Sequence, residues 1–112
     1  MTEPRLKTEI WVKACVRRAS VENIALAVVK RGDPDGGAVL VKLNRHAEGC
    51  TVYAETRDAN GARAWHKGTG AAPVPEAEAD AYIARNRRID PDLWVIEIED
   101  RQGRLPFDAT FL

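Results

Sequence analysis

The sequence lacks the features that mark disulfide-rich, secreted and membrane-spanning proteins. Among its 112 residues there are only two cysteines, Cys15 and Cys50, which is too few for a disulfide framework. No segment approaches the run of about 20 apolar residues that a membrane-spanning helix requires, and no apolar run follows the first five residues. We therefore expect no secretory signal, no contact with membranes, a cytoplasmic location, and thiols that are reduced and partly buried.

The sequence also lacks net charge. Its 17 Lys and Arg residues balance 17 Asp and Glu residues, so no overall field favours binding to nucleic acid or to a membrane surface. A chain of this length buries roughly 65% of its unfolded surface, which suffices for a core without metal or disulfide support. We expect one domain over residues 1–112, with residues 1–5 and 108–112 as loosely ordered tails.

A strand is predicted most clearly near the end of the chain, between residues 94 and 100. One face of this segment carries three large apolar side chains, those of Trp94, Ile96 and Ile98. This period of two is typical of a half-buried strand, because successive side chains point to opposite faces. Turns at residues 90–92 and 100–103 bound the strand, which we expect to dock onto a sheet built by earlier residues.

Four further strands are predicted at residues 24–31, 38–44, 50–57 and 62–68. The first is apolar on both faces, as a central strand covered on both sides would be. The turn at residues 32–37, which is rich in Gly and Asp, predicts a hairpin between the first two strands. The pair Asn60-Gly61 predicts another hairpin between the last two, because Gly tolerates positive φ.

Two helices complete the predicted fold. Residues 76–88 follow Pro75, begin with acidic residues and end with arginines, an order that suits the helix dipole. Residues 6–18 fit either a helix or a strand, and their length favours a helix that begins at Glu9 with Thr8 as its cap. The sequence thus predicts an α+β domain, with a mainly antiparallel sheet of about five strands and two helices packed on one face.

A candidate binding face lies on the third and fourth of these strands. Its members are Tyr53, Arg57, Arg63, Trp65 and Lys67. If the faces of the two strands coincide, two aromatic rings lie among three cations, an arrangement with which sheets bind single-stranded nucleic acid. The alternative is that Trp65 belongs to the core, because large aromatic side chains are mostly buried.

An acidic cluster surrounds the last predicted strand. It consists of Asp90, Asp92, Glu97 and Glu99. Carboxylate oxygens are the preferred ligands of Mg²⁺ and Mn²⁺, so these residues could serve a metal-dependent hydrolase. The alternative is a solvated strand face beside an Asp-containing turn, because such metal sites need ligands from several elements. No zinc-ligand spacing or recognisable catalytic set is present, so we expect no bound metal, no cofactor and no catalytic residue.

Three segments carry a resemblance to a known family. They are residues 5–12, residues 30–33 and residues 90–100, the last reading Asp-Pro-Asp-Leu-Trp-Val-Ile-Glu-Ile-Glu-Asp. Over nearly its whole length the sequence resembles domain-of-unknown-function family 1491, a family of short bacterial proteins. The resemblance implies a stand-alone bacterial cytosolic domain and carries over no catalytic residue.

These observations favour a small, non-enzymatic binding or adaptor module whose partner is a protein. Trp11, Trp94 or the face of Tyr53 and Trp65 would form its contact surface. Weak binding of single-stranded nucleic acid is the first alternative function, and metal-dependent hydrolysis is the second. The sequence leaves the identity of the partner and the oligomeric state open.

Overall fold

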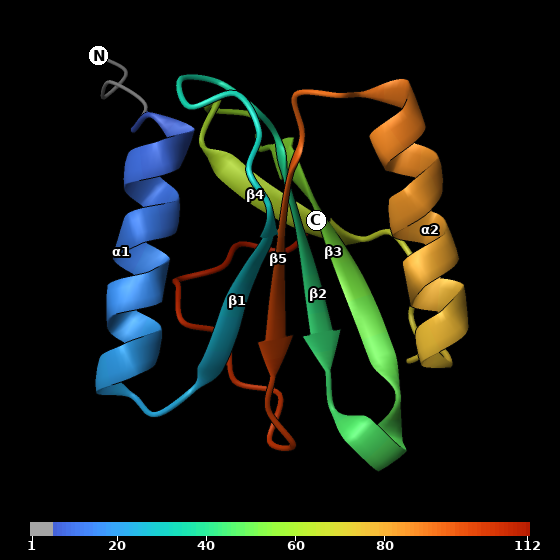
Figure 1. Cartoon of the computed structure of the whole chain (residues 1–112). Coiled ribbons are helices and arrows are strands. Elements are labelled where there is room, and N and C mark those ends of the chain that lie inside the picture. Colours follow the sequence, from blue (N-terminus) through green and yellow to red (C-terminus); the bar gives the residue numbers. More distant parts are fainter. Residues whose placement is uncertain (1–5) are drawn as a thin grey trace.

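The computed structural model describes residues 6–112 as a five-stranded sheet with two helices packed against it (Figure 1). The elements in chain order are α1 (Thr8–Val21), β1 (Ala25–Lys30), β2 (Val39–Asn44), the short 3-10 helix η1 (His46–Glu48), β3 (Cys50–Arg57), β4 (Arg63–Lys67), α2 (Glu76–Ile89) and β5 (Trp94–Glu99). The predicted α+β class is confirmed, and the ambiguous first segment is a helix. None of the described helices is long and apolar enough to cross a membrane. The prediction for residues 1–5 lies outside the described residues.

β5 lies between two strands that follow one another in the sequence. The order in the sheet is β1-β5-β2-β3-β4, and β5 runs antiparallel to β1 but parallel to β2. The sheet is therefore mixed, and the predicted hairpin between residues 24–31 and 38–44 is wrong. The pairs β2–β3 and β3–β4 are antiparallel as predicted.

The side chains of β1 and β5 explain their places in the sheet. In β5, Val95, Ile96 and Ile98 are at most 1% exposed, because the strand is covered on both faces. β1 contains two alanines and is largely exposed, so the prediction that it is a central strand is wrong. Burying the larger side chains of β5 removes more apolar area from water than burying those of β1, and the free energy of folding favours β5 in the middle.

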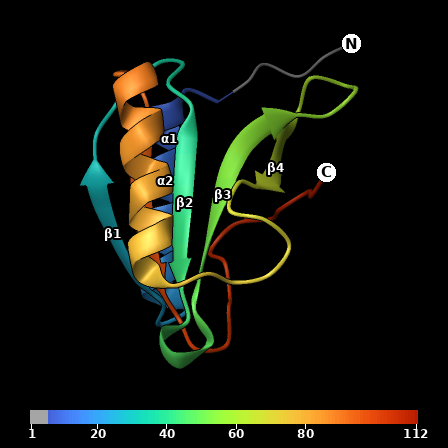
Figure 2. The ribbon, with the colours of Figure 1, turned by 90° about the vertical axis from the view of Figure 1, so that its right-hand side faces the viewer.

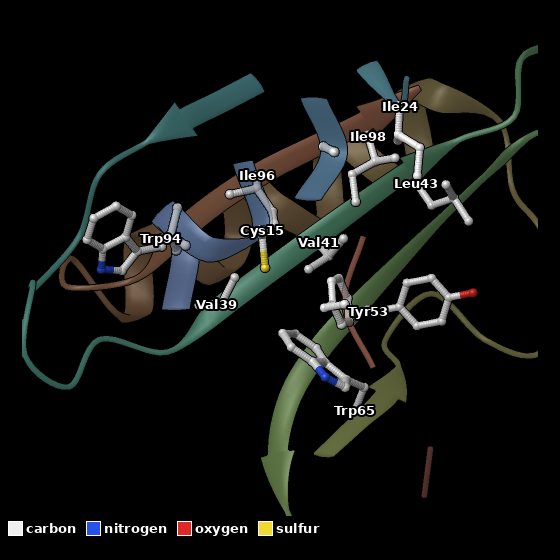
Figure 3. Close-up of a cluster of buried hydrophobic side chains, with 13 residues drawn as sticks. Cys15, Ile24, Val39, Val41, Leu43, Tyr53, Trp65, Trp94, Ile96 and Ile98 are labelled. Carbon is white, nitrogen blue, oxygen red and sulfur yellow. The ribbon is translucent and has the colours of Figure 1, made fainter. Parts of the chain in front are cut away.

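The two helices lie on opposite faces of the sheet, so the prediction of one shared face is wrong (Figure 2). The side that we call the α1 face packs against Val12, Cys15 and Ala19, and its main side chains are drawn in Figure 3. The other side, the α2 face, packs against Ala79 and Ile83. Both central strands carry apolar residues on both sides, so each face requires a cover of its own.

The turn between β1 and β2 fixes the start of α1. Its carbonyls at residues 34 and 35 accept hydrogen bonds from the first two N–H groups of the helix, at 3.0 and 3.2 Å. The buried hydroxyl of Thr8 donates to the carbonyl of Gly37 at 2.7 Å. The helix therefore begins at Thr8 rather than at Glu9, because carbonyls of the turn satisfy its first N–H groups in place of a side-chain cap.

The C-terminal residues 108–112, which were expected to form a tail, run along β4. The N–H of Trp65 donates to the carbonyl of Thr110 at 2.8 Å, and the N–H of Leu112 donates to the carbonyl of Trp65 at 2.9 Å. Phe111 packs on Tyr53 with 5.4 Å between the ring centroids. The unpaired backbone groups of an edge strand attract such a segment, so one edge of the sheet is closed by the chain itself.

Candidate functional site

The predicted aromatic and basic face exists, but its two rings belong to the core. β3 and β4 pair with Tyr53 opposite Lys67 and Arg57 opposite Arg63, so the faces of the two strands coincide as the hypothesis required. This common face is the α1 face, where Tyr53 is 9% exposed and Trp65 is 1% exposed (Figure 3). Neither ring presents a surface on which a nucleic-acid base could stack.

Further aromatic rings cover Trp65 from the outside. The ring centroids of Trp11 and Phe107 lie 5.5 and 5.1 Å from that of Trp65. Trp94 is 1% exposed, and its indole N–H donates to the carbonyl of Asp33 at 2.7 Å. The tryptophans that the sequence suggested as a contact surface therefore stabilise the core.

The cations of this face bind groups of the protein itself. The carboxylate of Glu55 lies 3.4 Å from Arg63 and 3.5 Å from Arg57. The guanidinium of Arg63 also lies 4.6 Å from the centre of the Trp11 ring. Of the three predicted phosphate-binding cations, Lys67 is the one that is exposed, at the end of β4.

The four predicted acidic residues do not converge. Asp90 and Asp92 lie in the turn before β5, where the Asp90 carboxylate accepts a hydrogen bond from the N–H of Asp92 at 3.0 Å. Glu97 and Glu99 lie toward the other end of β5 and pair with a lysine and a histidine, respectively. A strand rises about 3.3 Å per residue, so the two pairs are far apart. No group of three or more His, Cys, Asp or Glu in residues 6–112 is placed to hold a metal ion.

A buried lysine is the main polar feature that the sequence reasoning missed. Lys42 of β2 is 4% exposed, and its Nζ lies 2.7 Å from Glu76 and 2.8 Å from Asp80, both on α2. Glu97 of β5 is the third partner, at 3.1 Å. Burial alone lowers the pKa of Lys42, but the hydrogen bonds with the three carboxylates outweigh burial and raise the pKa above its ordinary value of 10.5.

This cluster joins α2 to two strands of the sheet. Its sequence signal was a lysine inside an otherwise apolar strand, together with two acidic residues four positions apart at the start of the helix. The single ammonium forms ion pairs with all three carboxylates, so the cluster is held together by these pairs and keeps a net negative charge. We interpret the cluster as a set of ion pairs that holds α2 on the sheet, and not as a reactive group.

A cavity of about 390 Å³ lies between η1 and the start of α2. The groups in it that could react are His46 and Cys50. Burial raises the pKa of the Cys50 thiol, which is 1% exposed, so this thiol stays protonated at neutral pH. The Nε2 of His46 lies 3.7 Å from the carboxylate of Glu99. A nucleophilic mechanism needs an activated nucleophile in contact with a base, and no such pair lines this cavity among the described residues.

β1 is the open edge of the sheet. It pairs regularly with β5 from Ala25 to Val28, and the register shifts between Val28 and Lys30, which marks a bulge. The outer N–H and C=O groups of β1 have no strand partner in the part of the chain that the structure describes. Val28 and Val29 are nevertheless 37% and 54% exposed, so this edge combines free hydrogen-bonding groups with apolar side chains.

The first of two grooves beside this edge lies between α1 and β1, and we call it the α1 groove. Its volume is about 170 Å³, and its apolar lining is formed by Val12, Val16, Val28 and Trp94. Its charged lining consists of Glu9, Lys13 and Arg31. The two cations lie 3.0 and 3.7 Å from the single carboxylate, so the groove carries an excess of one positive charge.

The second groove, which we call the α2 groove, lies between α2 and the strands β5 and β1. Its volume is about 210 Å³, and its apolar lining is formed by Val29, Ile83, Ala84 and Val95. Its charged lining consists of Lys42, Asp80, Arg87 and Glu97. Both carboxylates are bound to Lys42, whereas the exposed Arg87 makes no ion pair with a described residue.

Solved structures of similar proteins match nearly the whole length of this chain. A crystal structure and an NMR structure, both of a DUF1491 family protein from Caulobacter crescentus CB15, share 38% sequence identity with the chain. They cover 96% and 98% of this chain and 100% and 99% of their own, with TM-scores of 0.84 and 0.83. A solution structure from A. tumefaciens shares 28% identity, covers 96% of this chain and 98% of its own, and gives a TM-score of 0.74.

The family comparison agrees with these structures. The model of the family described as "Protein of unknown function (DUF1491)" matches residues 6–108. A comparison with curated proteins finds no match.

Proposed function

Since the chain belongs to the DUF1491 family, whose description assigns no activity, we propose from the site itself that it is a non-enzymatic protein-binding module with β1 as its contact surface. The observation that carries the proposal is the difference between the two edges of the sheet. The edge of β4 is closed by the segment around Thr110, whereas β1 keeps exposed Val28 and Val29 beside two grooves.

The edge strands of a sheet carry backbone groups that have no partner within the sheet. An open edge with apolar side chains is a template for pairing with another chain, and natural proteins protect such edges by charges, bulges or covering segments. This chain covers the edge of β4 at Trp65 with its own C-terminal segment, but at the other edge it places only a bulge at Val29. A surface that is left open in this way is expected to be covered by a partner.

The family and the cysteines support a bacterial and cytoplasmic setting for this module. The similar structures come from Caulobacter crescentus and A. tumefaciens, which are bacteria. Cys15 belongs to the α1 face and Cys50 to the α2 face, so the sheet separates the two free thiols. An arrangement without a disulfide suits a reducing compartment.

Site-specific photo-crosslinking in the organism that encodes the chain tests the proposal. We expect p-benzoylphenylalanine in place of Val29 to form a discrete adduct with another protein. As a control, p-benzoylphenylalanine in place of the exposed Glu78 on α2 should form no adduct. The adduct at position 29 should disappear when Val28→Lys is added to a chain that still folds. Equal adducts from both positions, or an adduct at position 29 that survives Val28→Lys, would contradict the proposal.

The geometry gives no support to the two other functions suggested by the sequence, binding of single-stranded nucleic acid and metal-dependent hydrolysis. Trp65 and Tyr53 lie in the core, and Asp90 and Asp92 lie far from Glu97 along β5, so neither a stacking surface nor a set of convergent metal ligands favours them.

A further inference from the structure

We infer, on the basis of the proposed function, that the partner is a short extended segment of another protein, acidic and apolar in composition, which adds to β1 as an additional strand. Backbone hydrogen bonds to β1 would provide affinity, and the two grooves would select the side chains.

The regular part of β1 sets the length of the added strand. β1 pairs in an even register with β5 only from Ala25 to Val28, and the bulge that follows disrupts the ladder at Val29. A strand added to the outer edge therefore extends over about four residues of β1 before the bulge twists the edge away. A partner that binds through so few backbone bonds depends on its side chains for specificity.

The bulge also places one exposed valine beside each groove. Val28 lines the α1 groove and the bulged Val29 lines the α2 groove. Successive side chains of an added strand point to opposite faces of the sheet, so they would reach the two grooves in turn. Because both grooves have apolar linings, neighbouring residues of the partner should both be apolar, and β-branched residues suit a strand best.

The charges beside the edge select an acidic partner. Lys13 and Arg31 outnumber the single carboxylate of Glu9 in the α1 groove. In the α2 groove the positive charges of Lys42 and Arg87 equal the negative charges of Asp80 and Glu97, so this groove adds no excess charge of either sign. Carboxylates that flank the apolar residues of a partner would therefore find complementary charge on the α1 face.

The same charges disfavour a second copy of this chain as the partner. In a two-fold symmetric pair formed through β1, the same patch of surface meets itself. The excess positive charge of each α1 groove would then lie near that of the other copy, and like charges brought together in this way cost free energy. A partner of opposite charge carries no such cost.

A selection from random linear peptides displayed against the immobilised full-length chain tests the inference. We expect the enriched peptides to contain adjacent β-branched residues flanked by Asp or Glu. In NMR titrations with the most enriched peptide, the amide signals of Ala25 to Val28 should shift, and those pointing away from β5 should exchange more slowly with water. A version of the peptide with N-methyl groups on alternate residues keeps the side chains but should not bind.

Two matched pairs of variants locate the contact. Val28→Lys should weaken the peptide affinity by about tenfold or more, whereas Val21→Lys, an identical change at an 82% exposed position at the end of α1, should leave it unchanged. Lys13→Glu should weaken binding, whereas Lys67→Glu, which changes the net charge equally at a distant strand, should not. Thermal unfolding of each variant confirms that the fold is retained.

Three outcomes would overturn the inference. In the first, the selection enriches basic peptides or no peptides. In the second, the NMR signals that shift belong only to residues outside β1 and its grooves. In the third, the chain associates with itself and Val28→Lys abolishes this association. The last outcome would make a second copy the occupant. The photo-crosslinking result separates these failures from failure of the proposed function, because an adduct at Val29 without selection of acidic peptides rejects only the inferred partner chemistry.

Discussion

Lys42 carries a charge into a layer of the molecule that is filled mainly by apolar side chains. Its ammonium contacts Glu76, Asp80 and Glu97, which come from a helix and a neighbouring strand. A buried charge stabilises a fold only weakly when it is paired, but removing one partner leaves the others uncompensated. At this position the sequence pattern alone suggests a lysine on a solvated strand face, because periodicity does not reveal which helix will cover the strand.

Replacing the lysine should therefore destabilise the protein. We expect Lys42→Met to lower the free energy of unfolding by about 3 kcal/mol, because three carboxylates remain close together without their cation. Urea unfolding measures the change, with Lys67→Met on the exposed end of β4 as the control, for which we expect less than about 0.5 kcal/mol. Adding Glu97→Gln to Lys42→Met should recover part of the loss, and a double variant less stable than the single one would argue against this electrostatic cause.

The two thiols should be unreactive in the folded protein. Burial raises the pKa of the Cys15 thiol to about 12 and also raises that of Cys50, so the reactive thiolate is scarce at pH 8. We expect a thiol-specific reagent to label neither cysteine in buffer and both in urea. Val21→Cys, at an 82% exposed position, provides the positive control and should react at once. Rapid labelling of either thiol in buffer would show that the packing on one face of the sheet opens and exposes that thiol to the reagent.

At the scale of elements, the turn between β1 and β2 does more than connect two strands. It binds the start of α1 through the Gly37 carbonyl and holds the indole of Trp94 through the carbonyl of Asp33. The N–H of Asp33 in turn donates to the carbonyl of Asp92 at 2.9 Å. The turn thus ties the start of α1 to the start of β5, two segments that are distant in sequence.

Two adjacent glycines of this turn offer a matched test. A Cβ added at Gly37 would overlap the carbonyl oxygen of Asp92 and lie 2.9 Å from Cδ1 of Trp94, whereas at Gly36 the nearest atom would be 3.9 Å away. We expect Gly37→Ala to destabilise the protein by about 3 kcal/mol through overpacking, and Gly36→Ala to change stability by less than about 1 kcal/mol. Equal melting temperatures for the two variants would contradict the close packing of the turn.

The elements themselves were largely predictable, but their places in the sheet were not. The alternation in β5 and the Pro75 start of α2 are local patterns, and both elements lie where these patterns predict them. The parallel pairing of β5 with β2 depends on contacts between residues 55 positions apart, for which no local signal exists. The same limit applied to the binding face. The alignment of Tyr53 and Trp65 followed from their strands, while the distant rings of Trp11 and Phe107 cover Trp65 and that of Phe111 covers Tyr53.

At the scale of the whole molecule, buried groups with raised pKa values, Cys15 and Lys42 among them, make stability depend on alkaline pH. The unfolded chain releases the proton of Cys15 near its ordinary pKa of 9.0 and that of Lys42 near 10.5, whereas the folded protein retains both protons to higher pH. Above pH 9 the unfolded state therefore binds fewer protons than the folded state, and stability falls as pH rises. Below pH 9 these two groups contribute no pH dependence.

Urea unfolding at several pH values tests this dependence. Each group should reduce the free energy of unfolding by up to about 1.4 kcal/mol per pH unit above its own ordinary pKa. The Lys42→Met protein, although less stable, should lose less stability between pH 10.5 and 11.5 than the unaltered protein. An equal slope in the two proteins would exclude Lys42 as a source of the dependence.

The central place of β5 has a consequence for the synthesis of the chain. A ribosome adds about 5–20 residues per second, so roughly 4–15 seconds separate the completion of α1 from the arrival of β5. During that time β1 has no neighbour on either side, because its one partner in the finished sheet has not yet been made. The nascent chain therefore cannot complete its sheet until β5 has left the ribosome.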